Sequence, residues 1–199
     1  MKLNLETLAA VTAIIVSVAA LFVAWDQSQV MRAQQHASVW PIVDVDMTID
    51  ADESSLYIAL EAVNLGVGPA LLKSSSLSIN GQAIETFEEF DNLALVPELQ
   101  GTRRIFSSPL RGIMGAGQSK TILRISWEQT EENKAAFVKL ASKYIGDDAA
   151  DIDVGVCYCS VFDKCWSFNE DSNSEPTLVE HCPTMEQDPI EKLMRSINT

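Results

Sequence analysis

The sequence predicts a mainly β protein with one membrane-spanning helix at its amino end and an antiparallel β-sandwich after it. Two observations carry this prediction. Residues 8–25 form an uncharged apolar run, whereas the remainder of the 199-residue chain is acidic and contains short alternating segments separated by turn residues. Strands and helices do not alternate regularly, which argues against a parallel α/β sheet.

The apolar run reads LAAVTAIIVSVAALFVAW from residue 8 to residue 25. As an α-helix it is about 27 Å long at about 1.5 Å per residue, close to the hydrocarbon thickness of a bilayer, about 30 Å. In lipid, a lone segment satisfies its backbone hydrogen bonds only as a helix. Trp25 then lies at headgroup level, and residues 26–40 continue as a helical stalk that Pro41 ends.

A cleaved signal peptide is the alternative interpretation of this segment, with residues 18–20 as a small-residue cleavage site. However, Lys2 is the only basic side chain before the apolar run, and the run continues past that site through Phe22. We therefore expect an uncleaved anchor.

The positive-inside rule favours neither orientation of the anchor clearly, because Lys2 lies on one side of the span and Arg32 on the other. The free amino terminus and the cysteines described below favour residues 1–7 in the cytoplasm. The domain then lies outside the inner membrane, in the periplasm. The inverted topology, with a reduced and zinc-bearing domain in the cytoplasm, is the alternative.

Small side chains recur along the predicted span at spacings of four, four, three and four residues. Such a stripe lets another transmembrane helix approach closely. The alternative is that alanine is simply common in membrane spans. The residues of the stripe are Ala9, Ala13, Ser17, Ala20 and Ala24.

Residues 26–199 carry the entire formal net charge of −14. This charge repels phosphate backbones and anionic lipid, so nucleic acid is excluded as a partner. It suits a domain that stays in solution, or one that faces a basic protein surface. The length after the stalk suits one domain over residues 41–186, followed by a terminal helix over 187–199.

Alternation of apolar and polar side chains predicts strands over 43–50 and 56–62. A third strand, 74–79, runs into Asn80-Gly81, which is a strong hairpin signal, and 82–84 return. Further strands are expected in three later segments, the last two of which form a second hairpin: 121–127, 152–161 and 165–168.

Two short helices interrupt the predicted strands. Phe87, Phe90 and Ala94 lie on one apolar helical face, and Pro97 closes that helix. Thr130 is a suitable cap for the second helix. Its apolar face has helical spacing and consists of Phe137, Leu140, Ala141 and Tyr144.

Seven or so short strands separated by turns favour an immunoglobulin-like or fibronectin-like arrangement. The residues Asn64, Gly66 and Ala70 form an N-x-G-x-x-x-A turn, and the run GAGQSKTIL leads into a later strand. These motifs resemble those of adhesion-type and other bacterial β-sandwich domains. The whole chain is similar to uncharacterised bacterial proteins that have one amino-terminal span and a small extracytoplasmic β-domain. That resemblance implies the same placement and no particular activity.

All four cysteines fall within 26 residues, at 157, 159, 165 and 182. Cys157 and Cys159 point to one face of a strand, so each is expected to pair elsewhere. If the hairpin turn centres near residue 162, Cys159 faces Cys165 and Cys157 is left for Cys182. Closing that loop of about 25 residues contributes on the order of 3 kcal/mol. Two disulfides require an oxidising compartment, which favours the periplasm.

The alternative interpretation of this cluster is a zinc or copper(I) site. The spacing C-x-C-x5-C-x16-C lacks paired C-x2-C knuckles, and no C-x-x-C opens a helix. We therefore expect no cofactor. The candidate metal ligands are Cys157, Cys159, Cys165, His181 and Cys182.

Two classes of function follow from these features. The favoured class is a non-catalytic, membrane-anchored binding or assembly module that contacts another envelope protein. The alternative is an envelope metal-binding or thiol-redox protein that uses the cysteine cluster. A histidine-dependent hydrolase is disfavoured, because His36 lies in the stalk and His181 lies beside Cys182.

Overall fold

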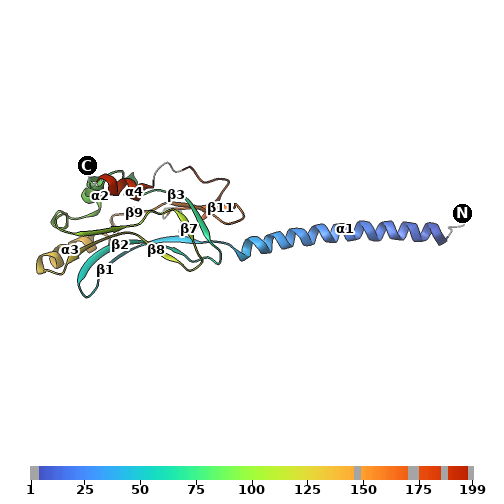
Figure 1. Ribbon diagram of the computed structural model, residues 1–199, viewed down its shortest axis with the longest axis horizontal. Coiled ribbons are helices and arrows are strands. Elements are labelled where there is room, and N and C mark those ends of the chain that lie inside the picture. Colours follow the sequence, from blue (N-terminus) through green and yellow to red (C-terminus); the bar gives the residue numbers. More distant parts are fainter. Residues whose placement is uncertain (1–4, 146–148, 170–174, 185–187, 197–199) are drawn as a thin grey trace. The chain divides into compact units, whose positions relative to one another are not determined.

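The computed structural model describes residues 5–145, 149–169, 175–184 and 188–196. The chain divides into two units, Met1–Val39 and Trp40–Thr199. Helix α1 belongs to the first unit, and the sheets and remaining helices belong to the second (Figure 1).

Helix α1 (Leu5–Ser38) is continuous through the predicted span and stalk, and it ends two residues before the predicted boundary. By length and composition it is able to cross a membrane, and its apolar side chains from Leu8 to Met31 are exposed. Two hydroxyls of the apolar run are satisfied inside the helix: Thr12 Oγ1 donates to the carbonyl of Leu8 at 3.0 Å, and Ser17 Oγ donates to that of Ala13 at 2.8 Å.

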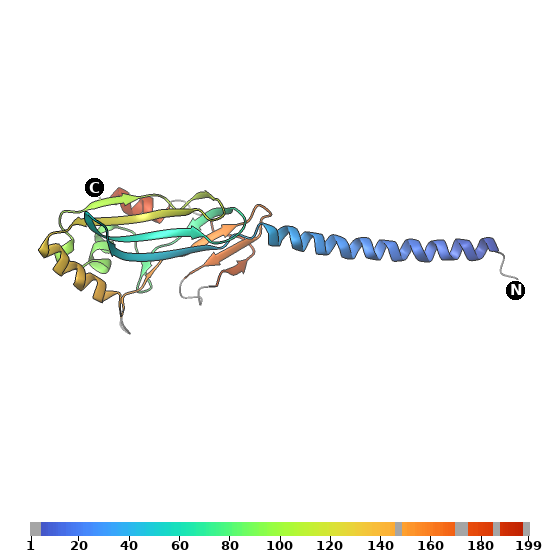
Figure 2. The ribbon, with the colours of Figure 1, turned by 90° about the horizontal axis from the view of Figure 1, so that it is seen from below.

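The first sheet is antiparallel and has the strand order β1-β2-β8-β6. Figure 2 shows its long strands side by side. Alternate side chains of β2, including Leu56, Ile58 and Leu60, are buried, as the sequence pattern predicts. The strands are β1 (Val43–Ala51), β2 (Ser55–Asn64), β8 (Ser119–Glu128) and β6 (Arg104–Ser107).

The second sheet is also antiparallel and has the order β12-β11-β10-β3-β7. Its strands are β12 (Thr177–Val179), β11 (Cys165–Phe168), β10 (Val156–Cys159), β3 (Ala70–Ser75) and β7 (Gly112–Met114). A small third sheet has the order β5-β4-β9 and comprises β5 (Gln82–Ala83), β4 (Ser78–Ile79) and β9 (Ile152–Asp153).

One hydrophobic core contains side chains from both larger sheets. Ile58 and Ile125 come from the first sheet, whereas Leu72, Met114 and Tyr158 come from the second. Each of the two sheets buries one apolar face in this core. Because the core is common to both, this burial stabilises the two sheets together.

Among the described residues, three helices and one 3-10 turn complete the domain. Thr86 caps α2 through a capping box with Glu89, and Thr130 caps α3, as expected. Helices α2 and α4 lie side by side, and Phe87 N donates to Ser196 Oγ at 2.7 Å (Figure 1). The elements are α2 (Phe87–Ala94), η1 (Pro97–Leu99), α3 (Glu131–Lys143) and α4 (Pro189–Ser196).

The Asn80-Gly81 hairpin is confirmed: the two residues have φ of 50° and 74° and join β4 to β5. Two strand predictions were wrong. The expected strand 152–161 is divided at Gly155 into β9 and β10, which belong to different sheets. The expected strand 74–79 is divided into the end of β3 and β4.

The predicted terminal helix forms as α4, beginning at Pro189. Residues 187 and 197–199 of its predicted range lie outside the described part of the chain. Strands β6 and β7 were not predicted.

Candidate functional site

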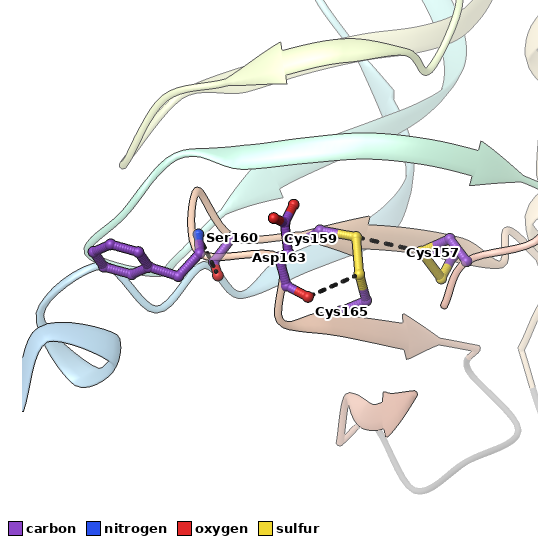
Figure 3. Close-up of a disulfide and its surroundings, with 7 residues drawn as sticks. Cys157, Cys159, Ser160, Asp163 and Cys165 are labelled. Carbon is purple, nitrogen blue, oxygen red and sulfur yellow. Dashed lines mark hydrogen bonds between the residues drawn. A yellow bond between two sulfur atoms is a disulfide. The ribbon is translucent and has the colours of Figure 1, made fainter. Parts of the chain in front are cut away.

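The four cysteines form two disulfides; three of them lie on strands of the second sheet, and Cys182 follows β12. Cys157 is bonded to Cys182, and Cys159 is bonded to Cys165 (Figure 3). These are the pairs expected from the hairpin, because Cys159 and Cys165 stand directly opposite each other in the β10–β11 register. The described residues contain no free cysteine.

The turn between β10 and β11 sets this register. Ser160 N donates to the carbonyl of Lys164 at 2.7 Å, and Asp163 N donates to the carbonyl of Ser160 at 3.1 Å. Asp163 has a φ of 57°, in the left-handed region that Asp tolerates in turns. A turn closed in this way places residues 159 and 165 as the first pair of the ladder.

The second disulfide ties the carboxyl-terminal segment to the same hairpin. Strand β12 pairs with β11, with Val179 opposite Cys165. Three residues later Cys182 bonds to Cys157, which closes a sequence separation of 25 residues. The segment therefore adds an edge strand beside the hairpin.

The two disulfides lie against each other. The Sγ atoms of Cys159 and Cys182, which belong to different disulfides, are 3.9 Å apart. Cys165 Sγ is 3.7 Å from the carbonyl oxygen of Asp163 (Figure 3). Cys157, Cys159 and Cys165 are at most 6 % exposed, whereas Cys182 is half-buried.

Three of the four cysteines line an open pocket of about 660 Å³. Cys157 does not line it and lies in a separate pocket on the same domain. Both cationic and anionic side chains surround the three cysteines. The lining residues are Lys73, Cys159, Asp163, Cys165, His181, Cys182, Pro183 and Thr184.

The structure brings together part of the candidate metal set. The Sγ atoms of Cys159, Cys165 and Cys182 lie within 4.8 Å of one another. Each of these sulfurs is committed to a disulfide, and a metal requires the thiolate form, so coordination would first need reduction. His181 lines the same pocket, and its side chain is 85 % exposed with Nε2 3.8 Å from Glu180 Oε1.

On the opposite face of β10, Tyr158 is fully buried between the two disulfide-bonded positions. Its ring stacks on Trp166 at a centroid distance of 6.1 Å, and Trp166 stacks on Trp40 at 6.3 Å. Burial raises the pKa of Tyr158 to about 12. The cysteine-bearing strand is therefore anchored in the core on one face and disulfide-bonded on the other.

Asn64 organises the end of the sheets where the domain begins. Its buried side chain accepts from Ile42 N at 3.2 Å and donates to the carbonyls of Gly68 at 2.8 Å and Met114 at 3.1 Å. Gly66 packs so closely that a Cβ there would lie 2.4 Å from the carbonyl oxygen of Trp40. These contacts give a structural role to the N-x-G motif.

Exposed apolar side chains gather at this same end. Strands β3 and β10 are antiparallel neighbours, with Leu71 opposite Cys159. The loop 65–69 before β3 and the turn 160–164 after β10 therefore lie at one end of the sheet. We name this surface the apolar end; its members are Leu65 (62 % exposed), Val67 (67 %), Val161 (48 %) and Phe162 (46 %). Sequence reasoning did not identify it, because its residues come from two separate turns.

The small-residue stripe predicted for helix packing lies on α1, and all its members are exposed: Ala9, Ala13, Ser17, Ala20 and Ala24. Its role in helix packing stays a prediction.

Comparison of this chain with protein-family models, curated proteins and solved structures finds no match.

Proposed function

We propose that this protein is a single-pass anchored module of the bacterial inner membrane whose β domain lies in the periplasm. The observation that carries the proposal is an exposed apolar helix of spanning length joined to a domain in which every described cysteine is oxidised. Disulfides persist outside the reducing cytoplasm, so they favour the extracytoplasmic side for the domain. Residues 1–7 are then cytoplasmic.

We also propose that the domain is an immunoglobulin-like β-sandwich with added elements. The shared core of the two larger sheets supports this arrangement. The third sheet and helices α2 and α3 are then insertions between sandwich strands.

The proposed role of the domain is non-catalytic binding of another envelope protein through the apolar end. Exposed apolar side chains that gather at one end of a domain are typical of interaction surfaces. The chain carries a formal net charge of −14, so the complementary partner presents apolar side chains surrounded by basic ones.

Site-specific photo-crosslinking in native membranes tests this role. A photoreactive residue replaces Val67, which is 67 % exposed at the apolar end, and in a matched control it replaces Val138, which is 69 % exposed on α3. We expect an adduct of defined mass from position 67 and none from position 138. The adduct should weaken with added salt, because a basic partner is attracted electrostatically, and should be lost when Leu65→Asp is also introduced.

Equal crosslinking from both positions, or an adduct that Leu65→Asp leaves unchanged, would contradict binding at the apolar end.

A further inference from the structure

The contact between the two disulfides has a chemical consequence. Thiol–disulfide exchange requires a thiolate to reach a disulfide sulfur, and Cys159 Sγ is already 3.9 Å from Cys182 Sγ. A thiolate released at Cys159 therefore has an electrophilic sulfur beside it, belonging to the other bond. The third sulfur of the pocket, Cys165, is the one whose attack by an external thiol releases Cys159.

We propose that the two disulfides form a thiol–disulfide exchange site that accepts electrons from a dithiol through the pocket beside β11. One thiolate of the dithiol attacks Cys165 Sγ. A mixed disulfide forms there, the Cys159–Cys165 bond breaks, and Cys159 leaves as a thiolate.

The second step occurs within the protein. The Cys159 thiolate attacks Cys182 Sγ, so that a Cys159–Cys182 bond forms, the Cys157–Cys182 bond breaks, and Cys157 leaves as a thiolate that takes a proton. The second thiol of the dithiol then attacks the mixed disulfide and releases Cys165 as a thiol. One dithiol is oxidised to a disulfide, and the protein passes from two disulfides to one disulfide and two thiols.

The arrangement of the pocket supports this order of events. Its lining includes the attacked residue Cys165, the relaying Cys159 and the receiving Cys182, whereas Cys157 lines another pocket. Lys73 lines the pocket beside β11 and favours a thiolate there, and the carboxylate of Asp163 opposes this effect. The surroundings of the three sulfurs are therefore electrostatically mixed.

The exchange keeps the carboxyl-terminal segment attached. The original bond spans a separation of 25 residues, and the new bond between Cys159 and Cys182 spans 23. The loop closed by the bond is almost unchanged, so the stabilisation from loop closure is retained. The protein can therefore take up two electrons without releasing strand β12 from the covalent framework.

Purified oxidised full-length protein in detergent, treated with one molar equivalent of dithiothreitol, tests the proposal. After acid quenching, free thiols are alkylated, the remaining bonds are reduced, and the alkylated positions are located by fragment mass spectrometry. Tyr158 lies between Cys157 and Cys159, so fragment ions separate the two. We expect the label on Cys157 and Cys165. Labelling of Cys159 and Cys165 instead, which is the result of simple reduction, would overturn the proposal.

A variant isolates the internal step. In Cys165→Ser, Cys159 has lost its partner and faces the remaining Cys157–Cys182 bond. At pH 8.5 about half of an ordinary cysteine is thiolate. We expect the free thiol to be found at both Cys157 and Cys159, with amounts that differ by no more than about ten-fold. A thiol confined to Cys159 would overturn the proposal.

The double variant Cys157→Ser/Cys165→Ser serves as the folding control, because it retains only the proposed product pair. We expect it to form the Cys159–Cys182 bond in air, with a far-ultraviolet circular dichroism spectrum like that of the native protein. Failure of the folded double variant to oxidise would overturn the proposed product. The proposal does not depend on partner binding, since all three measurements use the isolated protein.

Discussion

At the scale of single residues, the close approach at Gly66 decides what position 66 tolerates. The nearest atoms to an added Cβ are the backbone nitrogen of Ile42 and the carbonyl oxygen of Trp40, each at 2.4 Å. Backbone atoms cannot rotate away as a flexible side chain does. The chain entering the domain would therefore have to shift.

Gly66→Ala should destabilise the domain by about 1–3 kcal/mol, the usual cost of overpacking. Chemical denaturation of the full-length protein in detergent measures the effect. Gly101→Ala is the matched control, since a Cβ there meets no atom within 4 Å and its expected effect is within about 0.5 kcal/mol. Similar effects at both positions would show that the close approach at Gly66 is not limiting.

The burial of Tyr158 leads us to predict a loss of stability at alkaline pH. Its pKa is raised to about 12 by burial, whereas an unfolded tyrosine has a pKa of about 10. Between these values the unfolded chain has lost a proton that the folded chain retains, so the free energy of unfolding falls as pH rises. Denaturation midpoints between pH 9 and 12 should fall less steeply in Tyr158→Phe. Identical slopes in both proteins would contradict the assignment.

At the scale of elements, the β1–β2 turn depends on one charged side chain. Asp52 accepts from the backbone N–H groups of Ser54 at 2.9 Å and Ser55 at 2.8 Å, and it pairs with Arg124 at 2.8 Å. The backbone hydrogen bonds from Ser54 and Ser55 lower its pKa to about 2. The stabilising form is therefore the carboxylate.

Asp52→Asn should lower stability at pH 5–7 and have a progressively smaller effect as the pH falls from about 4 to about 2. The reason is that the unfolded carboxyl takes up its proton near pH 4 and the folded one only near pH 2. Paired denaturation curves of the two proteins at pH 6 and pH 2 check this. A difference that stays constant with pH would show that the charge of Asp52 contributes nothing.

The elements that the sequence predicts are those with one buried face. Strands β1, β2 and β8 are nine or ten residues long, and each contains a stretch in which apolar and polar residues alternate, so its periodicity is readable without neighbours. Strands β6 and β7 have only four and three residues and are largely exposed, so their sequences show no clear hydrophobic alternation. They are strands because they pair with the longer β8 and β3. Apolar residues continue to alternate through Gly155, although the chain passes there from β9 in the third sheet to β10 in the second. The sequence pattern therefore predicts one strand where the structure has two.

The cysteine pairing was predictable for a related reason. The β10–β11 hairpin is a local element, so its turn alone sets Cys159 opposite Cys165, and the remaining pair follows by elimination. The contact between the two disulfides was not predictable. It depends on where the segment carrying Cys182 returns to the sheet, which is a tertiary property.

At the scale of the whole molecule, the proposed topology rests on two independent observations. The described apolar side chains of α1 are exposed along a length that suits a bilayer, which supports a membrane anchor. The disulfides require an oxidising space. A single-pass protein with its amino end in the cytoplasm satisfies both, and the inverted topology satisfies only the first.

Protease treatment of intact spheroplasts distinguishes the two topologies. We expect the chain to remain in the membrane fraction after an alkaline wash, and added protease to remove the domain without lysis, because the domain faces outward. Spheroplasts treated after lysis provide the control for intrinsic protease sensitivity. A domain that survives in intact spheroplasts and is digested only after lysis would place it in the cytoplasm. The disulfides would then have to form after cell breakage, and acid-quenched alkylation of whole cells would find all four cysteines as thiols.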